Sequence, residues 1–141
     1  FLDDATVPLR VPLPGLLMIR KTNSDKAANY AVYAVKQRPT TFETALFHAP
    51  LPNVFNSGSI CWGTVQRVSD EALIGASLAE DWQQLLGSSF GNHAVSGKSR
   101  AYEDDIRKKL IDLEAKKARR YPTSDLISAR KTLAQVIGAR A

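Results

Sequence analysis

The residues of this sequence that suggest chemistry are a Pro-Asn dipeptide and, at a short distance after it, the chain's single cysteine. Asn53 follows Pro52 directly, and Cys61 lies eight positions after Asn53, with a turn-forming Asn56-Ser57-Gly58 between them. A cysteine thiolate accepts an acyl group as a thioester and so divides one difficult acyl transfer into two easier steps. A nearby asparagine amide can donate hydrogen bonds to the oxyanion that forms when an amine attacks, or to the backbone of its own loop. The spacing therefore predicts acyl transfer through Cys61.

A lone cysteine also has a structural interpretation. A free Cys is among the most buried residue types and often fills a core as a small apolar side chain. The turn and the Pro-Asn dipeptide at this distance favour the catalytic interpretation of Cys61. Gly58 is expected to supply a turn geometry that a larger residue would strain. Trp62, next to the thiol, either walls the site or packs beneath the loop.

These residues resemble the active-site motif of ubiquitin-conjugating enzymes, in which His-Pro-Asn is followed at the same spacing by the thioester-forming Cys. Leu51 stands where that family usually has His, so any loop-bracing role of the histidine is lost or supplied elsewhere. Further motifs are similar to the bacterial UBC-like proteins (prokaryotic family D), which include protein B of the cassette that carries ParB-related and ThiF-related genes. These motifs are Arg38-Pro39-Thr40, Thr44 to Pro50, Cys61-Trp62-Gly63, and the segment from Asp81 to His93 with its Phe-x-x-His ending.

The resemblance covers about residues 12–97 and implies an α+β UBC-like fold, with an antiparallel β-meander followed by an active-site loop and C-terminal helices. It implies that Cys61 receives the carboxyl terminus of a ubiquitin-like protein from a ThiF-like activating enzyme and passes it to a target amine. A JAB-type peptidase is implied in the same pathway. The activating enzyme supplies the energy from ATP, so no metal or organic cofactor is needed. Asn53 and His93 are then the catalytic neighbours of Cys61, and Pro52, Gly58 and Trp62 contact the substrate.

Two histidines are candidates for the base that deprotonates the attacking amine, because the pKa of histidine lies near neutrality. His93 lies in a Gly-Asn-His turn that the resemblance marks, and His48 lies on a predicted strand beside the loop. For each of them a structural role is the alternative.

Composition limits the class of protein. The chain has 141 residues, 44% apolar and 23% charged, as expected for one globular domain with a core of its own. No apolar run is long enough to span a bilayer, and the first residues lack the pattern of a signal peptide. A single Cys excludes an internal disulfide framework and a multi-Cys zinc site, and the two His lie far apart, so no metal site is expected. One thiol also agrees with a reducing cytoplasm.

The charge divides the chain near Gly97. Residues 1–97 carry seven Lys/Arg and eight Asp/Glu, a net of −1, whereas residues 98–141 carry twelve and six, a net of +6, which together give +5. We therefore expect a UBC-like catalytic core at 1–97 and a basic helical segment at 98–141 that packs on it. The chain starts at Phe1 and shows no helical pattern before Val11, so the N-terminal helix usual in UBC domains is expected to be missing from a trimmed or processed chain.

Hydrophobic patterning predicts strands early and helices late. The predicted strands are Gly15–Ile19, a central Tyr30–Val35 and a weaker Thr44–His48, followed by a loop over Pro50–Ser59. A helix through Leu78–Leu86 would start with a Ser77–Glu80 capping box and turn Leu78, Trp82, Leu85 and Leu86 inward.

Two amphipathic helices are expected in the basic segment. Glu103, Asp104 and Asp105 would open the first and pair at i,i+4 with Arg107, Lys108 and Lys109, as Asp112 would with Lys116; Ile106, Leu110 and Leu113 would form its apolar stripe. After Pro122, Ser124 would cap a second helix with Leu126, Ala129, Leu133, Val136 and Ile137.

Two other functions stay open at this stage. The chain is alternatively an inert UBC-like adaptor with a structural Cys61, which the residue Leu51 favours. The second alternative is a nucleic-acid-associated plasmid-maintenance component that acts through a patch of Lys116, Lys117, Arg119 and Arg120. Charge runs on helices are usually solvated faces, so nucleic acid is the less favoured partner.

Overall fold

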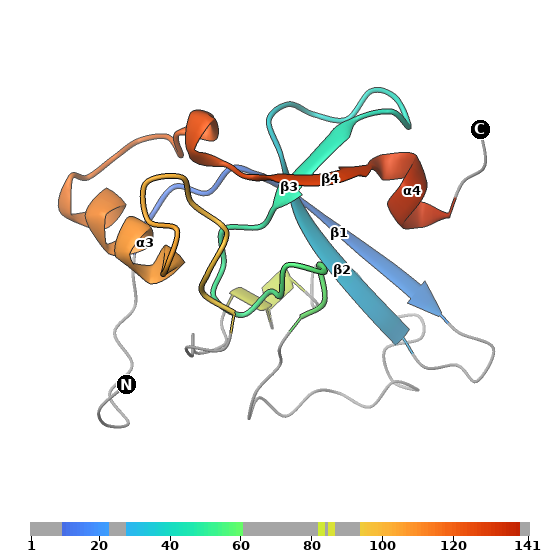
Figure 1. Ribbon diagram of the computed structural model, residues 1–141, viewed down its shortest axis with the longest axis horizontal. Helices are drawn as coiled ribbons and strands as arrows, with labels where there is room; N and C mark the ends of the chain where they lie inside the picture. The colour runs from blue at the N-terminus through green and yellow to red at the C-terminus, as the bar shows by residue number, and fades with distance from the viewer. Residues whose placement is uncertain (1–9, 23–27, 61–81, 84, 87–93, 139–141) are drawn as a thin grey trace.

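The structure is a computed structural model that describes residues 10–22, 28–60, 82–83, 85–86 and 94–138 (Figure 1). Its strands form one antiparallel sheet in the order β1-β2-β3-β4, of which the sequence predicts the meander of the first three strands. The strands are β1, Gly15–Thr22; β2, Ala28–Val35; β3, Ala45–His48; and β4, Ser128–Thr132. The helices are α3, Ile106–Ala115; the 3₁₀ turn η1, Thr123–Asp125; and α4, Leu133–Ile137. The sheet and the short C-terminal helices agree with an α+β fold.

β2 is an inner strand of the sheet, and both of its faces are buried. Val32 and Ala34 are fully buried, and Tyr33 and Val35 are almost so, although alternate residues of a strand point to opposite faces. This explains why the residues of this strand are apolar without the alternation of a half-exposed strand. The predicted strands at 15–19 and 30–35 are confirmed, and the hairpin continues them until Thr22 lies opposite Ala28.

The second helix predicted for the basic segment is wrong. Residues 128–132 form β4, which lies antiparallel to β3, and only 133–137 are helical. Ser124 lies in η1, while Thr132 caps α4 in a capping box with Gln135.

Pairing with β3 explains this difference. The spacing of the apolar residues from 126 to 137 suits a helix, but β4 supplies backbone partners to β3, which otherwise has an open edge. Arg130 has a φ of 57°, a left-handed conformation that a right-handed helix does not accept. At the start of α4, Leu133 N donates to Thr44 O at 3.0 Å. The basic segment therefore contributes a strand to the sheet that the first half of the chain begins, and a boundary at residue 97 stays a prediction.

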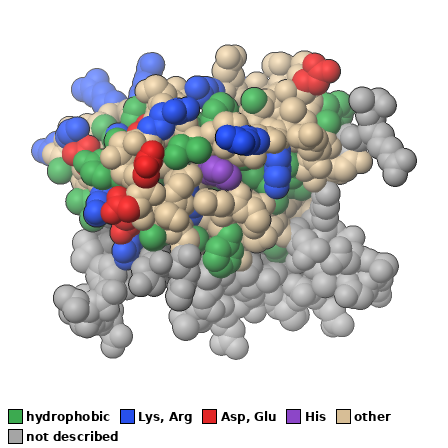
Figure 2. Space-filling model, viewed as in Figure 1, with side chains coloured by type: hydrophobic (Ala, Val, Ile, Leu, Met, Phe, Trp, Pro, Cys, Tyr) green, Lys and Arg blue, Asp and Glu red, His purple; other side chains and the backbone are tan. Residues whose placement is uncertain are grey.

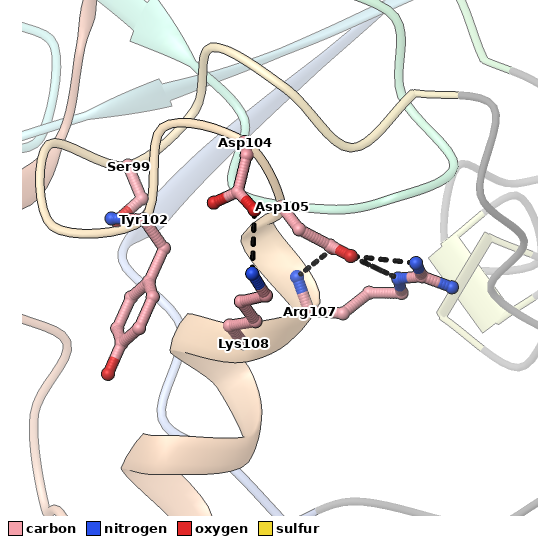
Figure 3. A network of polar contacts seen from close by, with 6 residues as sticks. All are labelled: Ser99, Tyr102, Asp104, Asp105, Arg107 and Lys108. Carbon is pink, nitrogen blue, oxygen red and sulfur yellow. Dashed lines mark hydrogen bonds and ion pairs between the residues drawn. The ribbon is translucent and has the colours of Figure 1, made fainter.

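The first helix of the basic segment is confirmed as α3. Asp105 is its N-cap and accepts from Arg107 N at 2.9 Å, and Ile106, Leu110 and Leu113 are the buried stripe. Figure 3 shows the charged side chains at its start. Lys108 pairs with Asp104 at i,i+4 as predicted, whereas Arg107 pairs with Asp105 two positions away. The predicted pair of Lys116 with Asp112 is also present, at 2.9 Å.

The predicted helix at 78–86 is described only at four residues, and all four are helical. Leu85 is fully buried and Trp82 packs against the same cluster, but Leu86 is 46% exposed, so its expected place on the buried face is wrong. Residues 1–9, with the question of an N-terminal helix, and the Ser77–Glu80 capping box lie outside the described residues. None of the described helices is long and apolar enough to cross a bilayer.

Candidate active site

Three of the predicted site residues can be placed, and three cannot. Pro52, Asn53 and Gly58 lie in the segment 50–60, which we call the Pro-Asn loop. Cys61, Trp62 and His93 lie outside the described residues. The structure therefore describes the loop that precedes Cys61 in the sequence and the residues that contact this loop.

The backbone of the Pro-Asn loop closes on itself. Val54 N donates to Leu51 O at 3.2 Å, and Phe55 N donates to Ser59 O at 2.8 Å. Val54 and Ile60 form an antiparallel bridge. The loop is thus a tight turn whose two arms pair at Val54 and Ile60, and Ile60 lies one residue before Cys61 in the sequence.

Gly58 fixes how this turn docks on the sheet. It has a φ of +94°, and a Cβ added to it would lie 2.7 Å from the Cζ and hydroxyl oxygen of Tyr33. Its carbonyl accepts from Val32 N at 2.9 Å, and the hydroxyl of Tyr33 donates to Ser57 O at 2.8 Å. The predicted turn role of Gly58 is confirmed, because a side chain would meet both strain and a steric clash. A contact with substrate at Gly58 or Pro52 stays a prediction.

Asn53 joins the loop to Leu85, one of the described helical residues 82–83 and 85–86. Its side chain is only 3% exposed, and its Nδ2 donates to Leu85 O at 3.1 Å. This contact belongs to the loop-bracing role that the sequence suggests for Asn53. Its alternative role, donation to an oxyanion, stays a prediction.

Leu51 occupies the position of the missing histidine as a core residue. It is 1% exposed and packs in a cluster with Met18, Val32, Val54 and Leu85. The leucine side chain has no hydrogen-bond donor. Any polar contact that braces this part of the loop must therefore come from another residue.

Lys98 is that residue, and sequence reasoning missed it. Its side chain is 1% exposed, and its Nζ donates to Leu51 O at 2.6 Å and also to the carbonyls of Val54 and Ala94. In Figure 1 residues 94–99 (gold) run beside the Pro-Asn loop (green), and Asn56 Nδ2 adds a bond to Ser96 O at 3.2 Å. Burial lowers the pKa of Lys98 to about 8, so the side chain is still mostly an ammonium ion at neutral pH.

A comparison with protein families shows the family of this chain. The family model described as Prokaryotic E2 family D matches residues 2–129. The chain belongs to prokaryotic E2 family D. No curated protein and no solved structure matches the chain.

Membership in prokaryotic E2 family D implies an E2-like conjugating role, with a ubiquitin-like protein and an E1-like enzyme as the general kinds of partner. The match also corrects the extent of the resemblance, which we expected only over 12–97. It continues through α3 to the start of β4 and so includes Lys98.

His48 is a half-buried neighbour of Lys98 in this E2-like chain. It stands opposite Tyr33 in the sheet. Burial lowers the pKa of His48, and the charges of Lys98 and Lys131 lower it further, against a hydrogen bond with the backbone of Asn56. His48 is therefore neutral at physiological pH, the form in which an imidazole can accept a proton.

Basic side chains of the E2-like chain lie widely over the face in Figure 2. Among the basic side chains of the described residues, several have protein partners: Lys98 is buried and donates to backbone carbonyls, and Arg107, Lys108 and Lys116 form ion pairs with aspartates. These pairs reduce the charge that the segment offers to a nucleic acid. In the described part of the chain, no three His, Cys, Asp or Glu side chains lie close enough to hold a metal ion.

Proposed function

We propose that this member of prokaryotic E2 family D carries a ubiquitin-like protein as a thioester on Cys61 and passes it to an amine of a target protein. Family membership over residues 2–129 supports the E2-like role. The observation that carries the specific proposal is the tight Pro-Asn loop, in which Val54 is bridged to Ile60, the residue just before the only thiol in the sequence.

The reaction has two steps, transfer of the modifier to Cys61 and transfer from Cys61 to the target amine. The thiolate of Cys61 attacks the thioester carbonyl on a ThiF-like activating enzyme; a new C–S bond forms, and the sulfur of the activating enzyme leaves as a thiolate. A target amine then attacks the thioester on Cys61, the C–N bond forms, and Cys61 leaves as a thiolate. The proton of the amine passes to a base. ATP is spent by the activating enzyme, so this chain needs no metal or organic cofactor for either step.

The other predicted residues have supporting roles in this proposal. Asn53 holds the loop or donates to the oxyanion, His93 is the candidate base, and Pro52, Gly58 and Trp62 line the path of the modifier. His48 is a second candidate base, because its neutral imidazole lies on β3 near the loop. A JAB-type peptidase would reverse the conjugation, and the reducing cytoplasm is the compartment that suits a free thiol.

The inert adaptor is the alternative that one residue favours. Leu51 cannot supply the polar contact expected from a histidine, which would suit a loop without catalytic function. The contacts of Lys98 weaken this alternative, since they supply a polar brace to the same stretch of backbone.

A serine at the position of the thiol tests the proposal. With the ThiF-like enzyme, the ubiquitin-like protein and ATP, Cys61→Ser should accumulate an adduct that resists thiol reductants and is released by alkali, as an oxygen ester is. Cys61→Ala should give none. Equal labelling of both variants would place the modifier elsewhere and contradict the proposal.

A further inference from the structure

Lys98 contacts the Pro-Asn loop on both sides of Asn53. Its Nζ donates to the carbonyl oxygens of Leu51 and Val54 in the loop, and to that of Ala94 in its own segment. With 1% of the residue exposed, hardly any water reaches this side chain. Loss of the lysine would leave buried carbonyls without this donor.

The number of donors matches the number of acceptors. An ammonium group has three N–H donors, whereas a neutral amine has two and carries a lone pair that cannot face a carbonyl favourably. Three carbonyls around one Nζ are thus the partners of a charged lysine. Such bonds to an ionised donor are stronger than neutral ones.

The backbone around Lys98 is fixed independently of the loop. Gly97 has a φ of +77°, and its N donates to Glu103 O at 2.8 Å. On the other side, the hydroxyl of Ser99 donates to Asp125 Oδ2 at 2.5 Å. Lys98 therefore extends from a segment that is hydrogen-bonded to Glu103, before the start of α3, and to Asp125 in η1.

We propose that Lys98 is a positioning residue of the E2-like site, which holds the Pro-Asn loop from the C-terminal segment in the place where Leu51 offers no polar side chain. Its effect on thioester chemistry rests on the function proposed above, whereas its hold on the loop does not. The basic segment then contributes a positioning residue to the site.

The test compares Lys98→Met, which has no donor, with Lys98→Gln, whose amide still donates. Lys108→Met, on the exposed side of α3, is the matched control. Hydrogen exchange of peptides covering residues 50–60 measures the loop, and peptides of α3 report on the rest of the fold. Discharge onto free lysine, divided by the amount of charged enzyme, measures the reaction.

At neutral pH we expect Lys98→Met to speed loop exchange on the order of tenfold and to slow discharge by a similar factor, since one or more buried hydrogen bonds are lost. Exchange in α3 should not change, Lys98→Gln should recover part of both effects, and Lys108→Met should behave as wild type. A folded Lys98→Met with wild-type loop exchange and discharge would overturn the proposal.

Lys98→Gln provides the second measurement if Lys98→Met does not fold. Its amide keeps a donor at this position but lacks the charge and the third N–H of the ammonium group. Loop exchange in Lys98→Gln should therefore be faster than in wild type, with exchange in α3 unchanged. A folded Lys98→Gln with wild-type loop exchange and discharge would overturn the proposal. If wild type is never charged by the activating enzyme, the proposed function fails and loop exchange alone decides the role of Lys98.

Discussion

The Nζ of Lys98 donates to the backbone carbonyl of Leu51 at 2.6 Å, across 47 positions of the chain. This bond connects the basic C-terminal segment with the loop that leads to Cys61. It also makes a buried charge part of the stability of the fold, with a measurable dependence on pH.

Stability should rise with pH in the alkaline range because of Lys98. Its pKa is about 8 in the folded protein and 10.5 when solvated, so between these values the unfolded chain binds more protons. The free energy of unfolding then increases with pH by up to about 1.4 kcal/mol per unit from this group. Urea titrations at pH 7.5, 8.5 and 9.5 measure it, and the same series on Lys98→Met subtracts all other groups. A parallel pH dependence in both proteins would contradict the assignment.

His48 should destabilise the fold in acid. Burial and the neighbouring lysines lower its pKa below the ordinary 6.5, so the unfolded chain takes up a proton at a higher pH than the folded protein does. Stability is therefore lost as pH falls below 6.5. Replacement by glutamine, which does not titrate, should make the loss between pH 7 and 5.5 smaller. An unchanged loss, measured by urea titration, would show that other groups cause it.

Gly58→Ala should destabilise the protein and disturb the loop. The new Cβ would lie 2.7 Å from the ring of Tyr33, at a φ of +94° that alanine seldom adopts. A cost of about 1–3 kcal/mol is expected from strain of this kind. Thermal unfolding measures it, with Ser59→Ala, at the exposed neighbouring position, as the control. Equal melting temperatures for the two variants would be incompatible with the described turn.

Asn53→Ala should weaken the contact of the loop with residues 82–86. The bond from Nδ2 to Leu85 O is buried, and its loss is expected to cost about 1–2 kcal/mol. Asn56→Ala removes a side-chain amide bond at the exposed end of the same loop and should cost less. If the two substitutions are equivalent in urea titrations, the burial of Asn53 has no energetic consequence and its role as a brace is wrong.

The parts of the fold that follow local rules were predictable. The segments 15–19 of β1 and 30–35 of β2 are continuous apolar runs, and α3 has its cap, its buried stripe and two of its ion pairs in the sequence. β4 was missed because an apolar spacing that suits a helix was overridden by pairing with β3, a contact between distant parts of the chain.

The site was predictable only in part, for a related reason. Spacing and turn residues mark Asn53 and Gly58, since their roles are local to the loop. No local pattern marks Lys98. It stands at the start of the basic C-terminal segment and resembles any solvated charge, and only folding brings it to Leu51 and Val54. Leu51 is the one hint in the sequence, because without a histidine at this position the brace of the loop is either lost or supplied by another residue.

The most direct test of the central claim is thioester formation on wild-type protein. Wild type and Cys61→Ala are each incubated with the ThiF-like activating enzyme, the ubiquitin-like protein and ATP, and separated with and without reductant. The account predicts an adduct on wild type that disappears with reductant and is absent from Cys61→Ala. An activating enzyme that charges itself but never transfers the modifier to wild type would contradict the account and favour the inert adaptor.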